Sequence, residues 1–223
     1  MFPWDRVSDA FWRDPSEDVY YLLHRWTGQA RRSILDLGCG LGRHSLLFAL
    51  YGFEVTALDA SESGLHRLEA AAAKLSLSVH TVHADLTKLP FDAGSFDFVL
   101  AYHSIYHADS EGMAAAMDEL HRILKPASEV YLTFNSKANP TYADPGNRVV
   151  DDHVRCKREE DGGILPHYYC DLDDVRRLLA GFTIVRLRHI EDVYADRSSW
   201  HYFVLARREC LTKLTPNRTR FER

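Results

Sequence analysis

One stretch of the sequence decides the fold: Ser33-Ile-Leu-Asp-Leu-Gly-Cys-Gly-Leu-Gly-Arg43. Its apolar first half predicts a short buried strand, and its three glycines predict a tight turn that opens directly into a helix. Such a turn lies at the carboxyl edge of the first parallel strand, where open α/β sheets bind ligands. The dinucleotide fingerprint GxGxxG is not met, because Arg43 stands where its third glycine belongs, and the pattern is DxGxGxG from Asp36 to Gly42. An ordinary strand-to-helix turn is the alternative interpretation of these glycines alone.

Working outward from this stretch, apolar runs rich in β-branched and aromatic residues alternate with segments of helical period. This order is typical of βαβ units around a parallel sheet. Three amphipathic helices connect the first five strands: one ends before Gly52, one begins at the N-cap Ser61, and one begins at the N-cap Ser110 and ends at Pro126. The strands that we expect are Ser33–Leu37, Glu54–Leu58, Ser78–Ala84, Phe96–Ala101, Glu129–Phe134, Thr183–Ile190 and Trp200–Ala206.

Two segments lie outside this alternation. Residues 14–27 begin with Asp14 as a helix cap and a proline at the first helical position, and they predict an extra helix in front of the first strand. Residues 154–169 hold two short strands around an Asp-Gly-Gly turn and predict a β-hairpin between the fifth and sixth strands. Asp171 then caps one more helix. We expect residues 1–223 to form a single domain, with the helix and the hairpin as additions to it.

The composition, 46% hydrophobic and 26% charged over 223 residues, is typical of a soluble globular protein. The longest stretch free of charged residues and histidine, Ser45–Phe53, is about half of the roughly 20 apolar residues that a membrane-spanning helix needs. The N-terminus is charged and lacks an apolar signal region, so we expect a cytoplasmic protein without a membrane partner. The four cysteines form no CxxC pair, which favours reduced thiols. The net charge of −5 argues against nucleic acid as a partner.

Acidic residues end the strands that follow the glycine turn. The second strand ends in Asp59, 17 residues beyond Gly42, the third ends in Asp85, and the fourth runs through an aspartate from Phe96 to Tyr102. The carboxylate of Asp59 can accept hydrogen bonds from both hydroxyls of a ribose. Acidic strand ends suit an uncharged nucleoside with a cationic centre better than a pyrophosphate, which requires Lys or Arg.

The sequence resembles the class I S-adenosylmethionine-dependent methyltransferases in five motifs that come in the order of that family. The resemblance covers about residues 33–135 and is closest to the small-molecule branch, which includes tellurite-resistance-type and ubiquinone-biosynthesis-type enzymes. It implies a Rossmann-like α/β fold: a seven-stranded, mostly parallel sheet with an antiparallel last strand and helices on both faces. The seven expected strands agree with this fold. The matching segments are Ile34–Arg43, Val55–Asp59, Ala84–Phe91, Phe96–Tyr102 and Leu120–Pro126.

The resemblance implies that the first motif holds the methionine part of S-adenosylmethionine. Gly38, Cys39 and Gly40 would let the backbone approach that part of the cofactor. Asp36 would order the turn and contact the amino group of the cofactor indirectly.

The later motifs are implied to hold the nucleoside. Asp59 would bind the ribose hydroxyls from the sheet edge, where we expect its carboxylate to contribute little to the stability of the fold, and Ala60 would lie beside the adenine. Asp85 would accept a hydrogen bond from the adenine amino group, and the Leu86 amide would donate to the ring. Tyr102 would lie where the methionine carboxylate meets the incoming substrate.

Methyl transfer from a sulfonium mainly requires alignment of the nucleophile and exclusion of water. A base becomes necessary when the nucleophile is a neutral alcohol or a protonated amine. The loop His103–His107 and the hairpin offer several imidazoles and phenols, and the resemblance places both segments near the substrate. We therefore name His107 and His167 as candidate catalytic residues, with structural or surface imidazoles as the alternative interpretation.

Two histidines and two cysteines of the hairpin region have a spacing that resembles metal ligands, namely His153, Cys156, His167 and Cys170. If Cys156 faces His167 across the hairpin, then His153 faces Cys170. Residues three apart on a strand point to opposite faces, so four ligands cannot converge. We therefore expect no metal site.

The function that the resemblance implies is transfer of a methyl group from the cofactor S-adenosylmethionine to a small-molecule acceptor. The alternatives are a non-catalytic S-adenosylmethionine-binding sensor or partner subunit, and an RNA or protein methyltransferase. The fourth strand leads into Tyr102-His-Ser-Ile and not into Asn/Asp-Pro-Pro-Tyr/Phe, which disfavours the exocyclic-amine nucleic-acid and glutamine enzymes of the family. We expect acceptor specificity to lie in the N-terminal helix, the loop 103–107 and the hairpin 154–169, and the sequence leaves the oligomeric state open.

Overall fold

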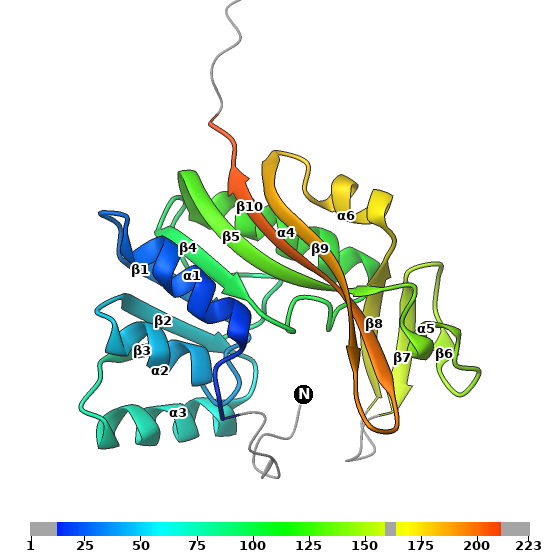
Figure 1. Ribbon diagram of the computed structural model, residues 1–223, viewed down its shortest axis with the longest axis horizontal. Coiled ribbons are helices and arrows are strands. Elements are labelled where there is room, and N and C mark those ends of the chain that lie inside the picture. The colour runs from blue at the N-terminus through cyan, green and yellow to red at the C-terminus, as the bar shows by residue number, and fades with distance from the viewer. Residues whose placement is uncertain (1–12, 159–163, 211–223) are drawn as a thin grey trace, which may run out of the picture.

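The computed structural model describes residues 13–158 and 164–210, which form a twisted sheet with helices on both faces (Figure 1). Neighbours in the order β3-β2-β1-β4-β5 pair in parallel, and β10 pairs antiparallel with both β5 and β9. The predicted fold class, a mostly parallel seven-stranded sheet with an antiparallel last strand, is confirmed. The seven strands are β1 (Ser33–Leu37), β2 (Glu54–Asp59), β3 (Val79–His83), β4 (Phe96–Ala101), β5 (Leu124–Ser136), β9 (Phe182–Val193) and β10 (Ser198–Arg208).

A small antiparallel extension branches from the end of β5. It consists of β6 (Arg148–Val149), β7 (Val154–Arg158) and β8 (Ile164–Cys170), and β8 also pairs in parallel with the end of β5. The hairpin predicted over residues 154–169 is confirmed as β7 and β8, and its turn at 159–163 lies outside the described residues. The strand β6 and the short helix α5 (Pro140–Ala143) have no counterpart in the sequence prediction.

The longer helices are α1 (Glu17–Thr27), α2 (Arg43–Leu50), α3 (Glu62–Lys74), α4 (Ser110–Ile123) and α6 (Leu172–Leu178). The extra helix predicted over residues 14–27 exists, but Ser16 is its N-cap, so it begins later than predicted. The N-cap of α4 is Asp109, whose side chain accepts a backbone N–H of the first turn, and the predicted cap Ser110 is the first helical residue. Two further predicted caps are confirmed, Ser61 and Asp171.

Each face of the sheet has its own apolar core, because successive strand residues point to opposite faces. In β1, Ile34 packs with α1 and α2, whereas Leu35 and Leu37 pack with α4. Figure 1 accordingly shows α1 in front of the sheet and α4 behind it. Trp26 of α1 stacks on Phe98 of β4 with ring centroids 4.7 Å apart. Since helices cover both faces, the carboxyl ends of the parallel strands and their loops are left to form a site.

A buried carboxylate fastens α1 to the sheet. Glu129 of β5 accepts hydrogen bonds from Arg25 at 2.7 and 2.8 Å, from Trp26 Nε1 at 3.0 Å and from Arg207 at 2.9 Å. Burial by itself would raise the pKa of Glu129, but the hydrogen bonds from these three side chains outweigh it and lower the pKa to about 2. Loss of one partner from such a buried pair leaves an uncompensated charge and is strongly destabilising.

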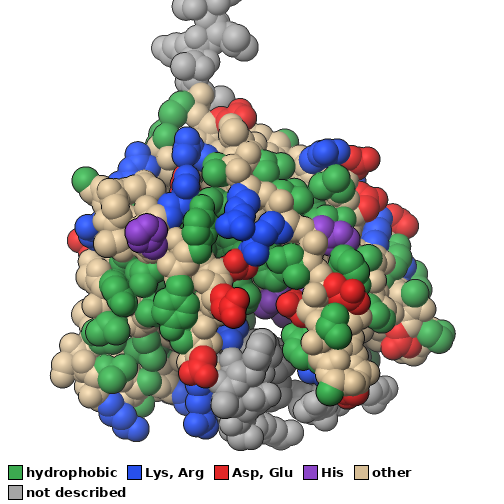
Figure 2. Space-filling model, viewed as in Figure 1, with side chains coloured by type: hydrophobic (Ala, Val, Ile, Leu, Met, Phe, Trp, Pro, Cys, Tyr) green, Lys and Arg blue, Asp and Glu red, His purple; other side chains and the backbone are tan. Residues whose placement is uncertain are grey.

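Among the described residues no helix is long and apolar enough to cross a membrane. Basic and acidic side chains are mixed over the face shown in Figure 2, and neither sign of charge forms a continuous patch there. This face therefore lacks the basic stripe that marks a nucleic-acid-binding surface.

Candidate functional site

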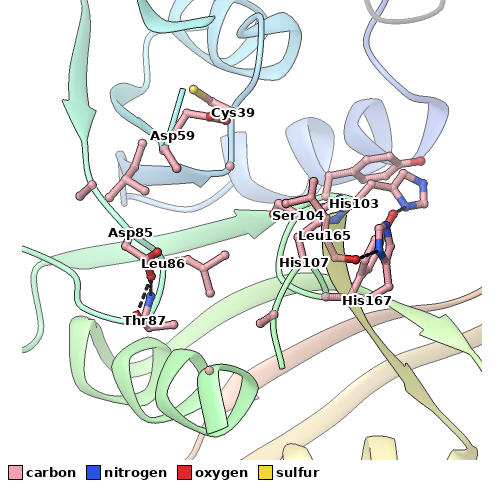
Figure 3. Close-up of a pocket in the computed structure, with 18 of the residues that line it drawn as sticks. Cys39, Asp59, Asp85, Leu86, Thr87, His103, Ser104, His107, Leu165 and His167 are labelled. Carbon is pink, nitrogen blue, oxygen red and sulfur yellow. Dashed lines mark hydrogen bonds between the residues drawn. The ribbon is translucent and has the colours of Figure 1, made fainter. Parts of the chain in front are cut away.

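A cavity of about 650 Å³ opens at the carboxyl ends of the parallel strands, the edge at which the sequence predicts a ligand. The turns after β1, β2, β3 and β4, the start of α4 and both strands of the hairpin contribute to its wall. Figure 3 shows two groups of side chains. We call the part lined by Asp59 and Asp85 the carboxylate side, and the part lined by His103, His107 and His167 the imidazole side.

The glycine turn after β1 has no room for a side chain at Gly38 or at Gly42. Gly38 and Gly42 have φ angles of 74° and 79°, which residues with a Cβ rarely adopt. A Cβ on Gly38 would lie 2.3 Å from the Cβ of Ser104, and one on Gly42 would lie 2.2 Å from Leu68 Cδ1. The turn is therefore packed between the loop after β4 and helix α3, which fixes the backbone that faces the cavity.

Asp59, the last residue of β2, holds this turn and also faces the cavity. Its Oδ2 accepts a hydrogen bond from the Gly40 N–H at 2.8 Å, and its Oδ1 accepts one from the Ser61 N–H at 2.8 Å. Burial raises the pKa of this carboxyl group, which is only 9% exposed. A carboxylate has about four acceptor positions, so capacity for a ligand is left. These two hydrogen bonds argue against the expectation that Asp59 contributes little to stability, because the carboxylate also holds the backbone of the turn.

Asp36 and Gly40 are the two predicted cofactor residues that do not line the cavity. Asp36 is buried behind the turn, where it accepts a hydrogen bond from the Ser45 hydroxyl at 2.6 Å. Burial raises the pKa of Asp36 to about 6, and the hydrogen bond from Ser45 opposes that rise. Any effect of Asp36 on a ligand must therefore pass through the turn. The other predicted cofactor residues line the cavity, namely Gly38, Cys39, Asp59, Ala60, Asp85, Leu86 and Tyr102.

Asp85 lies on the segment that follows β3, and Figure 3 shows it bonded to Thr87. Its Oδ1 accepts hydrogen bonds from the Thr87 N–H at 2.7 Å and from the Thr87 hydroxyl at 2.5 Å. The carboxylate is exposed, and the neighbouring Leu86 lines the cavity beside it. The bonds to Thr87 fix the direction of a carboxylate that is open to the cavity.

The segment before α1 contacts the site through Arg43 and His44, which both line the cavity. The Asp14 carbonyl accepts a hydrogen bond from Arg43 Nη1 at 3.1 Å, and the Ser16 N–H donates to His44 Nε2 at 3.3 Å. The His44 ring packs edge-on against Tyr102 with ring centroids 5.1 Å apart. The residues that precede the predicted N-terminal helix therefore lie next to the cavity.

The imidazole side gathers rings that lie far apart in the sequence. His107 and His167 pack edge to face with ring centroids 4.7 Å apart. Tyr106 and His103 share a hydrogen bond of 3.2 Å between the hydroxyl and Nδ1. His201 of β10, which the sequence analysis did not single out, lies behind them with its ring centroid 4.4 Å from that of His103. The two candidate catalytic histidines are thus brought together.

The electrostatics of this side keep its imidazoles uncharged at neutral pH. Desolvation, and after it the positive charge of Lys157, lower the pKa of His107 to about 4. Desolvation, His107 and Lys157, in that order, lower the pKa of His167 to about 3. Lys157 lines the cavity, and the sequence analysis missed it because one lysine on a hairpin strand carries no pattern.

The register of the hairpin corrects one expectation. Cys156 lies opposite Pro166, and His167 lies opposite Arg155, so Cys156 does not face His167. The pairing of Cys156 with His167, from which we expected no metal site, is therefore wrong. Within residues 13–158 and 164–210, no three His, Cys, Asp or Glu side chains are grouped so that they could hold a metal ion. Metal independence stays a prediction.

The sheet order, the DxGxGxG turn and the cavity at the carboxyl edge together define the class I S-adenosylmethionine-dependent methyltransferase fold. Residues 34–127 match the family described as a methyltransferase domain. This part of the chain therefore belongs to that family, as its motifs predict, and S-adenosylmethionine is the cofactor of the family.

Comparisons with known proteins agree with this assignment. The chain is 33% identical over 124 residues to a sterol 24-C-methyltransferase of Gibberella zeae, and the matched region covers 53% of this chain and 32% of that protein. It is 30% identical over 139 residues to a ubiquinone biosynthesis O-methyltransferase of Pseudomonas paraeruginosa, and the matched region covers 58% of this chain and 56% of that protein. The chain thus spans from about a third to just over half of the length of these relatives. The solved structure of an S-adenosylmethionine-dependent methyltransferase from Methanosarcina mazei superimposes with a TM-score of 0.74 at 20% identity, covering 88% of this chain and 99% of that one.

Proposed function

We propose that the protein is a cytoplasmic S-adenosylmethionine-dependent methyltransferase that acts on a small-molecule acceptor. The observation that carries the proposal is the carboxylate of Asp59, which holds the glycine turn and still faces the cavity. The hydroxyls of a ribose can donate to its remaining acceptor positions while the cofactor lies against the backbone of the turn. The names of the two relatives, a sterol and a ubiquinone-biosynthesis enzyme, support a small-molecule acceptor.

The carboxylate side matches the chemistry of this cofactor. Asp59 and Asp85 supply acceptors for hydroxyl and amino groups, and their negative charges favour a ligand with a cationic centre. The exposed carboxylate of Asp85 and the Leu86 amide are proposed to hold the adenine, with Ala60 beside it. The full set that we propose for the cofactor is Asp36, Gly38, Cys39, Gly40, Asp59, Ala60, Asp85, Leu86 and Tyr102.

Bound S-adenosylmethionine would supply a methyl group on a sulfonium, so this chain mainly has to orient the acceptor and exclude water. A general base works best when its pKa lies near the operating pH. With pKa values of about 4 and about 3, His107 and His167 are weak bases. We therefore propose that these two neutral imidazoles act as catalytic residues by orienting the acceptor through hydrogen bonds, and not by removing its proton.

The experiment that tests this function follows the methyl group. The purified protein is incubated with methyl-labelled S-adenosylmethionine and three acceptor fractions: dialysable metabolites, RNA and soluble proteins. We expect label only in a dialysable product, and a chelator should leave the transfer unchanged. Label in RNA or protein would favour the macromolecular alternative. Cofactor binding without transfer to any fraction would favour the sensor or partner subunit.

A further inference from the structure

Lys157 of β7 is a charged side chain of the cavity that the proposed cofactor site does not use. It lies opposite Leu165 of β8, and both residues line the imidazole side together with His167. Lys157, His107 and His167 line the same cavity, and the positive charge of Lys157 lowers the pKa of both imidazoles. The hairpin, which the sequence predicts as a specificity element, thus brings one cation to the acceptor end of the cavity.

Within residues 13–158 and 164–210, Lys157 forms no ion pair. The carboxylates that line the cavity, Asp59, Asp85 and Asp109, are held elsewhere by backbone or threonine donors. Asp109 lies near Thr87, because a Cβ on Gly112 would contact both side chains. These carboxylates therefore belong to the carboxylate side, and no carboxylate of the described residues forms an ion pair with Lys157.

We propose that the methyl acceptor is a small organic anion whose negatively charged oxygen, a carboxylate or phenolate, pairs with Lys157. This inference rests on the proposed function, since it names the acceptor of that reaction. Lys157 keeps the acceptor ionised, because an opposite charge nearby favours the charged form of an acid. It is a specificity-determining residue that contacts the substrate.

Methyl transfer to such an anion requires no base. A lone pair of the acceptor oxygen forms the new O–CH₃ bond as the C–S bond breaks, and the sulfur takes the bonding pair. The sulfonium becomes a neutral thioether, and the anion becomes a neutral ester or ether. No proton leaves, so the weakly basic His107 and His167 are sufficient as orienting groups.

The inference is tested with matched probes that differ in charge: benzoate with benzamide, salicylate with salicylamide, and 4-nitrophenolate with 4-nitroanisole. Binding of each probe is measured by NMR titration at saturating S-adenosylhomocysteine. We expect the anionic members to bind better than their uncharged partners. The Lys157→Met variant, which keeps the apolar stem, should weaken the anions about tenfold or more, as loss of a hydrogen bond to a charged group predicts. Carboxylate and phenolate probes tell the two kinds of anion apart.

Two further variants control for loss of structure. Lys157→Arg should restore binding of the anions, and Lys74→Met, at an exposed position in the last turn of α3 that does not line the cavity, should leave it unchanged. The inference would be overturned if no anionic probe binds better than its uncharged partner. It would also be overturned if the Lys157→Met variant binds the anions as well as the wild-type protein does. A calorimetric titration of S-adenosylhomocysteine into the wild-type protein distinguishes failure of this inference from failure of the proposed function. If S-adenosylhomocysteine does not bind, the proposed function itself fails. If it binds, a negative result with the probes overturns only the anionic acceptor.

Discussion

Replacement of Asp59 by alanine should damage stability and cofactor binding together. The carboxylate accepts hydrogen bonds from the backbone N–H groups of Gly40 and Ser61, both at 2.8 Å in a buried position. Each buried donor left without a partner costs about 1–3 kcal/mol, so the two predict a loss of about 2–6 kcal/mol in the free energy of unfolding. Loss of the charged acceptor for the ribose should also weaken S-adenosylhomocysteine about tenfold or more.

The matched control is Asp85→Ala, which removes a carboxylate that is exposed and bonded only locally to Thr87. This variant should lose cofactor affinity with little change in the urea midpoint. Urea unfolding and calorimetric titration on both variants, well below their melting temperatures, separate the effects. An Asp59→Ala protein of wild-type stability would show that the carboxylate does not hold the turn. Wild-type affinity in a folded Asp59→Ala protein would refute its role in the cofactor site.

Three other residues give predictions for urea unfolding. Gly42→Ala should lower the free energy of unfolding by about 1–3 kcal/mol more than Gly52→Ala does. The two positions share the same backbone strain, with φ angles of 79° and 78°, but only at position 42 would a Cβ also clash with Leu68. Such overpacking adds to the cost of the strain. Equal midpoints would contradict this account. Glu129→Gln should lower the free energy of unfolding by about 1.5–3 kcal/mol, because the buried carboxylate loses its charge and with it the charge-assisted hydrogen bonds from Arg25 and Arg207, whose own side chains are partly exposed. A loss within error would show that the cluster does not fasten α1. His167 has a folded pKa of about 3, below the unfolded value of 6.5, so the unfolded chain binds more protons and stability falls as the pH drops below 6.5, by about 2 kcal/mol at pH 5. His167→Gln should lose that part of the pH dependence, and an unchanged pH profile would disagree with the buried neutral ring.

Much of the sheet could be predicted because its signals are local. The bounds predicted for β1 and β4 are those of the structure, since continuous apolar runs are closed by glycine or by polar loops. The prediction for β5 began at Glu129, whereas the strand begins at Leu124. The early part pairs across an irregularity in the ladder, with Ala127 at a φ of 59°, and no apolar pattern marks such a segment.

The two sides of the cavity differ in how far the sequence predicts them. The carboxylate side could be predicted because parallel strands bring Asp59 and Asp85 to one edge directly after their own motifs. The imidazole side depends on the register of the hairpin, and a shift by one residue turns every side chain to the other face. His201 and Lys157 come from strands far along the chain, and only the tertiary pairing of those strands brings them beside His103 and His107.

The central claim is that the cavity at the carboxyl edge of the sheet binds S-adenosylmethionine. Calorimetric titration of S-adenosylhomocysteine into the wild-type protein, with a nicotinamide dinucleotide as the competing probe, tests it most directly. The structure predicts one binding event per chain for S-adenosylhomocysteine and no heat with the dinucleotide, because the turn is DxGxGxG and its partners are acidic. Binding of the dinucleotide without binding of S-adenosylhomocysteine would contradict the assignment of this site.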